Sequence, residues 1–510
     1  MNRDPESSQV SGNVGAPGAT QNPEELPSTH GFGAPWEVAD LPEPPPFSLR
    51  NTFRVIGPGA ILLASAIGGG EWLVGPAQAV EHTVALFWIV TLAIFFQLIF
   101  NLEGVRYTLY TGEPIYGGIL RLWPGPKFWS IFYSVGGFLQ IAWPALPLLG
   151  ASTLFSAVSG RLAAEGEAGA GDARTLQFIA VGLIALGVAI LQFGGTIERM
   201  LEYVSWFMLA FIFLFLFFVN VWFVPFDKWI ATLEGFLGMA GGAGGAIDWT
   251  LLGALAATAG SGGLGNFTIT NWIRDKGFGM GALAGAIPSA VGSRRVRLSS
   301  TGIVFPANER NLARWRVWTR YVHVDQIFVW AIFCFIGMFL NVNLVMGMDI
   351  PPGTKFTGLG AGAYQAYYLA DKLWPGFWFL TLLNGFWILF STQLGNTDIL
   401  VRTVTDISWL ASSRVRAWRG GDVRAVYYTI LFALAVWGLI ALWWGKGAAM
   451  FQLLANMAGL LLAIGGVQIF IVNRRFLPRA VRPPLWREVL LLASSAFYGF
   501  FTYQWLSGLI

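Results

Sequence analysis

Apolar stretches of about 20 residues alternate with short polar segments from residue 55 to the end of the chain. A helix needs about 20 apolar residues to cross a bilayer. Helices that are apolar on every side are typical of membrane spans, because lipid offers backbone groups no partner. The pattern therefore predicts an all-α integral membrane protein of eleven helices, at 55–80, 84–105, 128–157, 175–193, 200–224, 251–273, 324–347, 376–401, 425–444, 449–472 and 485–507.

Residues 1–50 differ from everything after them. They are rich in Pro, Gly, Ser and Glu and contain no apolar run. That composition predicts a disordered tail, and without an apolar core segment it is not a cleaved signal peptide.

The basic residues indicate an orientation. With a cytoplasmic N-terminus, all but six of the 32 Lys and Arg fall on the cytoplasmic side; the six are Arg161, Arg174, Lys228, Lys355, Lys372 and Lys446. The positive-inside rule then predicts a cytoplasmic N-terminus and a C-terminus outside. The basic loop 274–323 is interpreted as an orientation signal that contacts lipid headgroups, in preference to a nucleic-acid site.

Composition narrows the function. Of the 510 residues 55% are hydrophobic and only 12% charged, whereas soluble domains carry about 25% charged residues. One cysteine, Cys334, and three histidines, His30, His82 and His323, exclude a disulfide framework, a Cys/His zinc site and most His-dependent catalysis. We expect a protein that is not an enzyme and has no cofactor.

Two predicted helices contain glycine clusters at mid-span. The first reads GPGAILLASAIGGGEWLVGP, in which Gly occupies 68–70 and Glu71 follows. The sixth reads GALAATAGSGGLGNFTITNW, in which four Gly surround Ser261 and Asn266 follows. Because each mid-helix Gly costs about 1 kcal/mol relative to Ala, the clusters predict unwound backbone, which persists at membrane depth only where it lines a cavity.

The spacing of these breaks predicts the architecture. Each opens a block of five helices, as in secondary transporters built from inverted repeats. We expect a first repeat at 51–225, a second at 226–473 and an eleventh helix within 474–510. The alternative is that the glycines serve close helix packing.

At these residues the chain resembles the Nramp family of divalent-metal transporters. The matching segments are Gly68-Gly69-Gly70-Glu71-Trp72 in helix 1, Arg106 with Thr111-Gly112, Phe193-Gly194 with Glu198, Tyr321 with Val324-Asp325, and Asn473-Arg474-Arg475. The resemblance implies a LeuT-type 5+5 inverted repeat with discontinuous helices 1 and 6, plus an eleventh helix.

The chain departs from the family at the site. The family's metal-binding Asp falls on Gly68 and its Asn on Glu71, and its Met-Pro-His-Asn segment falls on residues 263–266, where only Asn266 is kept. Pro144 and Pro147 replace the helix 3 carboxylates that the family uses for protons. These departures imply transport without proton coupling.

Glu71 is the first candidate ligand. A carboxylate at mid-span costs about 2.5–3.5 kcal/mol on insertion scales and needs a partner. A cation could be held by Glu71 and Asn266, the predicted metal ligands, with backbone oxygens freed around the breaks at Gly68, Gly70, Ser261 and Gly263. Oxygen ligands suit hard ions such as Mg²⁺ or Mn²⁺. Alternatively, Glu71 is a buried structural lock.

Other embedded polar residues are weaker candidates. Gln393, Asn396 and Gln452 either line the substrate pathway or bond to neighbouring helices. Glu103 with Arg106, and Asp398 with Arg402, have the spacing of structural ion pairs on one helical face.

The leading hypothesis is a secondary transporter that moves a hard divalent cation by alternating access without proton coupling. The alternative is a transporter of another small cationic or organic solute on the same scaffold. A third is a membrane sensor or assembly protein that kept the fold. The expected partners are the divalent cation and the lipid bilayer, with no nucleic acid, and the oligomeric state stays open.

Overall fold

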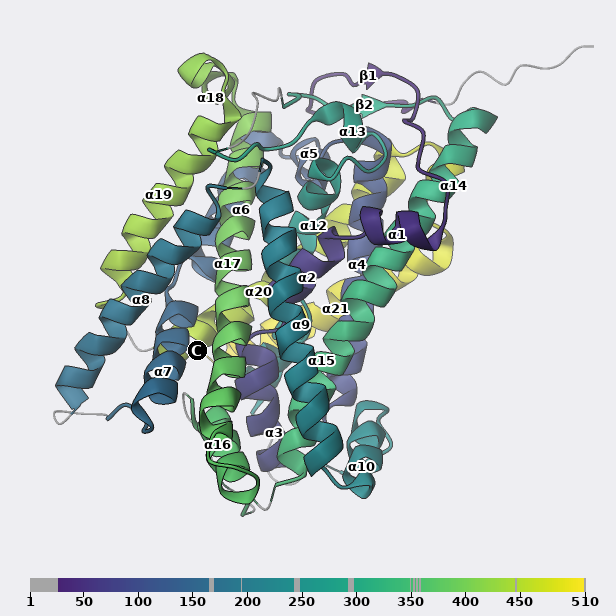
Figure 1. Ribbon diagram of the computed structural model, residues 1–510. Coiled ribbons are helices and arrows are strands. Elements are labelled where there is room, and N and C mark those ends of the chain that lie inside the picture. Colours follow the sequence, from purple (N-terminus) through teal and green to yellow (C-terminus); the bar gives the residue numbers. More distant parts are fainter. Residues whose placement is uncertain are drawn as a thin grey trace, which may run out of the picture.

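A computed structural model describes residues 26–164, 169–193, 195–242, 248–291, 298–348, 350–351, 354, 356, 359–444 and 447–508. In this part of the chain, long helices form a bundle, and a two-stranded parallel sheet lies at one end of it (Figure 1). The strands β1 (Glu37–Val38) and β2 (Ile303–Val304) pair Glu37 with Ile303 and Val38 with Val304.

The helices of the first half are α1 (Leu49–Val55), α2 (Pro58–Ala66), η1 (Gly70–Val74), α3 (Gly75–His82), α4 (Trp88–Thr111), α5 (Ile115–Leu120), α6 (Pro126–Ile141), α7 (Ala145–Ser159), α8 (Ala170–Ile190), α9 (Ile197–Phe223) and α10 (Phe226–Phe236). Those of the second half are α11 (Trp249–Thr258), α12 (Leu264–Asp275), α13 (Gly281–Ala284), α14 (Glu309–His323), η3 (Val324–Ala331), α15 (Ile332–Met346), α16 (Gly360–Lys372), α17 (Phe377–Ala411), α18 (Ser413–Ala417), α19 (Val423–Ala441), α20 (Gly447–Phe476) and α21 (Leu485–Ser507).

The number of spans agrees closely with the sequence pattern. In the described residues nine helices are long and apolar enough to cross a membrane, or ten if the bent pair of α2 with η1 and α3 counts as one. The sixth expected span is present as two short helices, α11 and α12. The chain is thus an all-α, multi-pass integral membrane protein.

Both predicted breaks are confirmed. In the first span α2 ends at Ala66, helix resumes at Gly70, and the axis bends by 45° across the gap. In the sixth, helix stops at Thr258 and resumes at Leu264. Gly260, with φ +106°, adopts a backbone conformation that residues with a side chain rarely reach.

The third span differs from its expected continuous form. Helix α6 ends at Ile141 and α7 begins at Ala145. Pro144 lacks the N–H for an intrahelical bond and pushes the preceding residue away from helical geometry. The chain therefore breaks at Trp143 and Pro144 within the membrane.

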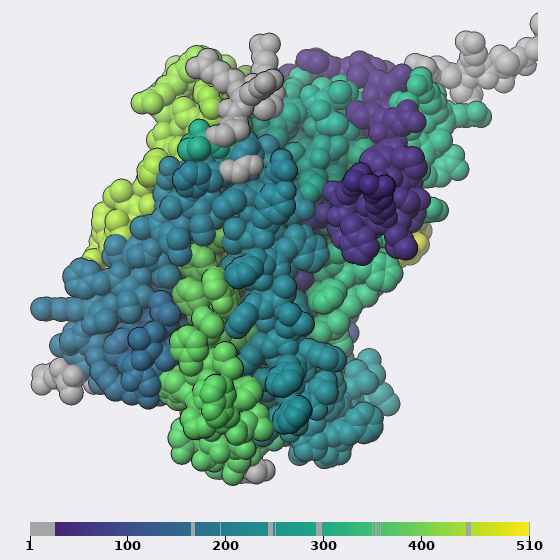
Figure 2. Space-filling view, in the orientation of Figure 1, coloured from purple at the N-terminus to yellow at the C-terminus, as the bar shows by residue number. Residues whose placement is uncertain are grey.

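The expectation of a disordered tail at 1–50 is wrong for residues 26–48, which we call the N-terminal strap; residues 1–25 lie outside the described part. The strap runs over the surface at the sheet end of the bundle (Figure 2). Leu41 is fully buried, and β1 completes the sheet. The composition could not predict this ordered structure, because the residues that hold the strap belong to other segments of the chain.

Side chains from distant helices hold the strap. Arg314 on α14 donates to the Leu41 carbonyl (2.6 Å), and Trp318 donates to the Pro42 carbonyl (3.0 Å). Arg121 donates to the Ala34 carbonyl (2.7 Å). The expected basic loop 274–323 is thus partly α14, where Arg314 binds the strap; Arg294, Arg295 and Arg297 lie outside the described residues.

Candidate functional site

A cavity of about 400 Å³ lies between the two helix breaks. The breaks lie side by side there, since a Cβ added at Gly70 would stand 2.7 Å from Thr258 Oγ1. The lining residues come from both breaks and from the helices around them: Ser65, Ala66, Gly68, Gly69, Gly70, Gln140, Leu146, Thr258, Gly260, Ser261, Gly262, Thr392, Asn396, Phe451, Leu454 and Ala458. We call this the central cavity.

Glu71 lies just behind this wall and is 1% exposed. Its Oε2 accepts a hydrogen bond from the Gly68 N–H at 2.8 Å, so it caps backbone freed by the break as a capping-box Glu does. The backbone of Gly260 is another polar group close to this carboxylate. Its second oxygen, Oε1, has no hydrogen-bond partner among the described residues. Glu71 therefore stabilises the first break and keeps one oxygen uncommitted.

Two glutamines hold the second break. Gln97 on α4 accepts from the Ser261 N–H (2.9 Å) and donates to the Ala259 carbonyl (2.8 Å). Gln140 on α6 donates to the Gly262 carbonyl (2.9 Å) and accepts from the Leu264 N–H (3.2 Å). Each side-chain amide thus replaces the helical partners that the unwound segment lost.

Hydroxyl groups satisfy further backbone at the first break. Thr392 on α17 donates to the Ile67 carbonyl (2.9 Å), and Ser65 donates to the Leu62 carbonyl (2.8 Å). A Cβ at Gly68 would stand 2.6 Å from Thr392 Oγ1, so glycine is required for this approach. Of the carbonyls expected to bind a cation, that of Gly68 accepts from the Trp72 N–H (3.1 Å), that of Gly70 from the Gly75 N–H and that of Gly263 from the Asn266 N–H (3.1 Å).

Ser261 and Gly263 lie at the second break as predicted, but each has a structural contact. The Ser261 hydroxyl accepts from Trp330 Nε1 at 2.8 Å. Gly263 has φ +65°, and a Cβ there would stand 2.5 Å from Gln140 Oε1.

Asn266 is buried one turn into α12 and is not among the described residues that line the central cavity. Its Nδ2 donates to Asn101 Oδ1 (2.9 Å), and Asn101 donates in turn to Gln326 Oε1 (3.1 Å). Gln326 donates to Asp325 (2.9 Å), which accepts from the Gly57 N–H (3.0 Å). Asn266 is thus one end of a buried polar chain that leads to the start of the first span.

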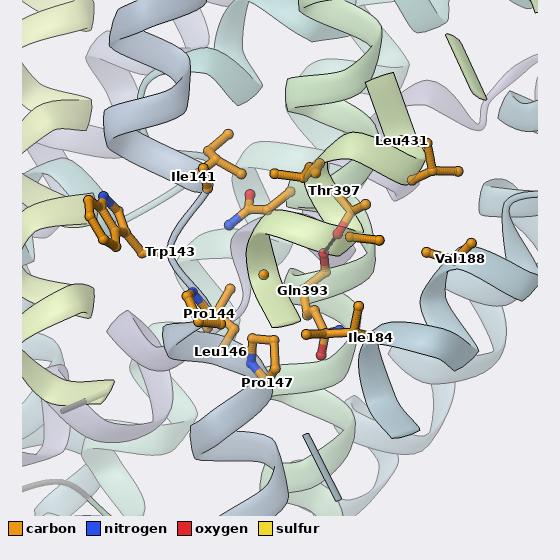
Figure 3. A pocket seen from close by; sticks show the side chains of 15 residues that line it. Ile141, Trp143, Pro144, Leu146, Pro147, Ile184, Val188, Gln393, Thr397 and Leu431 are labelled. Atoms are coloured by element: carbon orange, nitrogen blue, oxygen red, sulfur yellow. Dashed lines mark hydrogen bonds between the residues drawn. The ribbon is translucent and has the colours of Figure 1, made fainter. Parts of the chain in front are cut away.

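A second cavity, of about 540 Å³, adjoins the first and shares Leu146 and Asn396 with it. It lies where α6 and α7 break, between α8, α17 and α19, and we call it the side cavity (Figure 3). Gln393 lines the side cavity and Asn396 lines both. Gln452, the other predicted pathway residue, is exposed on α20 and lines neither.

The acidic groups do not form a multidentate metal site. Within the described ranges, no three His, Cys, Asp or Glu side chains cluster closely enough to hold an ion. The central cavity instead presents hydroxyl and amide groups from Ser65, Gln140, Thr258, Ser261, Thr392 and Asn396. The arrangement can solvate a polar or cationic guest with neutral dipoles, and Glu71 is the nearest carboxylate to the breaks.

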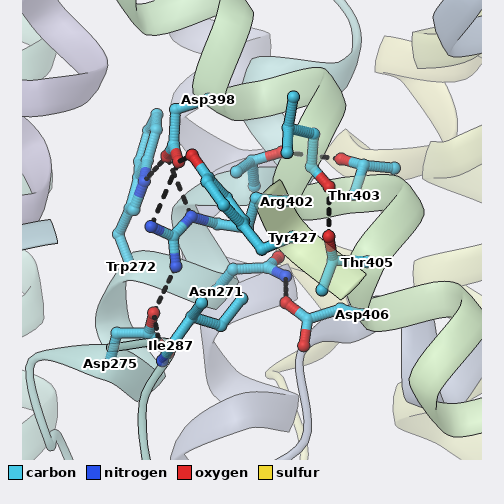
Figure 4. A network of polar contacts seen from close by, with 12 residues as sticks. Asn271, Trp272, Asp275, Ile287, Asp398, Arg402, Thr403, Thr405, Asp406 and Tyr427 are labelled. Atoms are coloured by element: carbon cyan, nitrogen blue, oxygen red, sulfur yellow. Dashed lines mark hydrogen bonds and ion pairs between the residues drawn. The ribbon is translucent and has the colours of Figure 1, made fainter. Parts of the chain in front are cut away.

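A network of buried ion pairs joins α12, α17 and α19 beside the sheet end (Figure 4). Asp398 accepts from Arg402 Nε (2.8 Å), Trp272 Nε1 (2.8 Å) and the Tyr427 hydroxyl (2.6 Å). Arg402 also pairs with Asp275. The Asp398–Arg402 pair expected from the sequence is therefore present, in a larger network than the spacing indicated.

The network continues through Arg274, which pairs with Asp275 (2.6 Å) and with Asp406 (2.7 Å). On the other side of the bundle Arg106 pairs with Glu103 (2.7 Å), as the spacing predicted, and Arg487 of α21 adds a second contact to Glu103 (3.2 Å).

Sequence reasoning missed Gln97, Gln140 and Thr392. The two glutamines had a usable signal, because each stands alone in an apolar stretch (IFFQLIF and GFLQIAW), where a polar group is costly without a partner. Thr392 gave no such signal in the sequence, because a threonine hydroxyl can donate its hydrogen bond to a carbonyl of its own helix.

No protein-family model matches the chain, and no curated protein matches it in sequence. Solved structures do match. A crystal structure of a variant of the manganese transporter of Eremococcus coleocola is 14% identical, with a TM-score of 0.60 over 94% of this chain and 90% of that one. A second variant is 13% identical with a TM-score of 0.59 over the same shares. The same transporter with an aromatic bis-isothiourea substituted compound is 13% identical with a TM-score of 0.56, again over 94% and 90%. The chain thus has the predicted LeuT-type fold.

Proposed function

We propose that this chain is a secondary transporter, distantly related to the Nramp family, that binds its substrate in the central cavity and works by alternating access. The observation that carries the proposal is that two interrupted helices from the two halves line a single cavity. Broken helices at membrane depth are otherwise costly and occur where a substrate is bound.

The proposed substrate is a hard divalent cation such as Mg²⁺ or Mn²⁺. The polar lining groups are oxygens and amides, and the one acidic oxygen near the breaks, Glu71 Oε1, is uncommitted. Mg²⁺ usually keeps several waters and binds one or two carboxylates. A partly hydrated ion with a single carboxylate behind the glycines fits that chemistry. Asn266, whose Oδ1 has no partner among the described residues, stays the proposed second ligand.

The test is cation uptake into proteoliposomes by the full chain, the Glu71→Gln variant and Glu234→Gln, which replaces an exposed carboxylate on α10. The amide keeps an acceptor for the Gly68 N–H but removes the charge. Glu71→Gln should reduce the affinity for Mn²⁺ at least tenfold with folding intact, whereas Glu234→Gln should match the parent. Equal uptake by both variants would make Glu71 a structural lock.

A small organic solute is the second candidate. It is favoured because no described residue lining the central cavity is charged, which suits a neutral guest better than an ion. Competition between Mn²⁺ and a panel of amines, amides and polyols in the same vesicles separates the two. Uptake of an organic solute without any cation uptake would support this second candidate over the first.

We further propose that transport is not coupled to protons. Pro144, Pro147 and Gly265 stand where the resembled family has proton carriers, and none of them titrates. The driving force would be the ion gradient and the membrane potential, about 2.3 kcal/mol per charge per 100 mV. A pH-sensitive dye inside the vesicles should report no substrate-dependent acidification at clamped potential. Acidification would reveal a proton route, with Glu103 or Asp398 as its first candidates.

The proposed orientation places the sheet end and the N-terminal strap in the cytoplasm and the C-terminus outside. Lys228 on α10 and Lys372 on α16 lie at the opposite end of the bundle (Figure 1). We keep 51–225 and 226–473 as the proposed limits of the two repeats. Accessibility of single cysteines placed in α10 and in the strap would test the orientation.

A further inference from the structure

We propose that the side cavity is a binding site for an uncharged amphiphile from the bilayer, a molecule with an apolar chain and a hydrogen-bonding head such as a primary amide or an alcohol. The site adjoins the central cavity proposed for the transported substrate and shares Leu146 and Asn396 with it. The empty space between its lining residues measures about 540 Å³, including the part that is open to the surroundings.

Two polar side chains of the cavity wall are already bonded, since Trp143 donates to the Leu139 carbonyl (3.1 Å) and Thr397 to the Gln393 carbonyl (2.8 Å). Gln393 is 6% exposed, yet its Oε1 has no hydrogen-bond partner among the described residues. A buried carbonyl oxygen is costly until a partner completes its bonding. Asn396 lies one helical turn away and faces the same space. Two amide side chains of α17 therefore line the cavity, and Figure 3 shows Gln393 among the side chains around it.

The remaining wall of the cavity is apolar, so the part of the guest beyond its head should be apolar too. It is formed by Ile141, Pro144, Leu146, Pro147, Ile184, Val188, Leu431 and Leu434, among others. An apolar chain of moderate length would make van der Waals contacts with these side chains.

The guest is uncharged because the described lining contains no counter-charge. The nearest part of the ion-pair network on α17, Asp398, already accepts three hydrogen bonds, from Arg402, Trp272 and Tyr427. A charged head would therefore be desolvated without compensation.

The guest comes from the bilayer because two walls lie at the edge of the protein. Within the apolar windows of α8 and α19, only 17% and 28% of residues are buried inside the protein. Both helices therefore face lipid for most of their length. Ile184 and Val188 of α8 and Leu431 and Leu434 of α19 line the cavity, so its wall belongs in part to these lipid-facing helices.

The experiment is photolabelling of the full chain in nanodiscs with decanamide that carries a mid-chain diazirine. Decylamine and decane with the same diazirine are the charged and headless comparisons. Peptides that contain 141–147, 184–188 and 431–438 should be labelled, and unlabelled decanamide should suppress that labelling. Decylamine should label these peptides weakly. Labelling by decane should increase with its concentration and not saturate.

Three variants sharpen the test. Ala435→Phe fills the cavity and should abolish saturable labelling, whereas Ala433→Phe, on the exposed side of the same helix, should not. Gln393→Leu removes one hydrogen bond and should raise the half-saturating concentration about three- to tenfold. Non-saturable labelling, equal in Ala435→Phe and the parent, would show contact with bulk lipid only and overturn the proposal. Equal saturable labelling by decylamine would overturn the uncharged head.

Discussion

The ion-pair network and the cavities are both rich in buried polar groups, but they use them differently. In the network each carboxylate has charged or hydrogen-bonding partners. Asp398, for example, accepts hydrogen bonds from three side chains. Around the cavities, Glu71 Oε1 and Gln393 Oε1 have no partner in the described structure. A fully paired network fixes the relative positions of helices, whereas unpaired groups are expected where a guest completes the bonding. The network's groups are thus engaged with one another, whereas these two oxygens beside the cavities stay available to the guests proposed above.

The largest expected effect is loss of the network's central cation. Arg402→Met leaves Asp398 buried without its charged partner and leaves Asp275 with Arg274 alone, which costs about 3–5 kcal/mol for a broken buried pair. Thermal unfolding in detergent should show a strongly destabilised protein. The exposed pair Arg161–Asp172 is the comparison. Arg161→Met should unfold at the same temperature as the parent protein. Equal stability of both variants would show that the network does not hold the helices.

A smaller but still large effect is expected at the second break. Gly263→Ala forces a side chain onto a residue with φ +65° and places Cβ 2.8 Å from the backbone Cα of Ala458. The strain should cost about 1–3 kcal/mol and distort the central cavity. Gly182→Ala on α8 is the control, because nothing lies within 4 Å of its added Cβ. If Gly263→Ala transported at the rate of the parent protein, the backbone conformation of the second break would not be required for transport.

The strap should respond to pH through Glu113, which lies outside the spans. Burial acts to raise the pKa of Glu113, but its ion pair with Arg121 and the N–H of Gly302 outweigh this and lower the pKa below its ordinary value of 4.5. A lowered folded-state pKa means that the stabilisation is present above pH 4.5 and is lost as the pH falls below it.

A spin label at Phe32→Cys measures this release. It should stay immobile at pH 7 and become mobile only below about pH 4.5. With Glu113→Gln the label should already be mobile at pH 7, whereas Glu309→Gln, at an exposed position of α14, should leave it immobile. A label that moves at neutral pH in the parent would show that the Glu113 pair does not hold the strap.

The smallest stability effect is expected at the side cavity. Gln393→Leu removes a buried oxygen that has no described partner, so the free energy of unfolding should stay the same or rise by up to about 1 kcal/mol. Thermal unfolding of the apo protein checks this. A clear loss of stability would mean that Gln393 has a structural partner, and that the contrast with the network is wrong at this residue.

The sequence alone was sufficient for features that depend on neighbouring residues. Long apolar stretches indicated the spans, and the clusters at 68–70 and 260–265 indicated both breaks. The Asp398–Arg402 and Glu103–Arg106 pairs followed from helical spacing. In each case the cause acts within about one turn of helix or along one segment, so no knowledge of the packing is needed.

Tertiary structure alone decided what the polar groups contact. Gln97 reaches a break more than 160 residues away, and the strap finds its partners on α14 some 270 residues away. Asn266 bonds to Asn101, outside the cavity it was expected to line. A side chain's type fixes which bonds it can make, but its partner is set by which helices pack together, and the helix breaks bring backbone, amide and carboxylate groups from distant segments within reach.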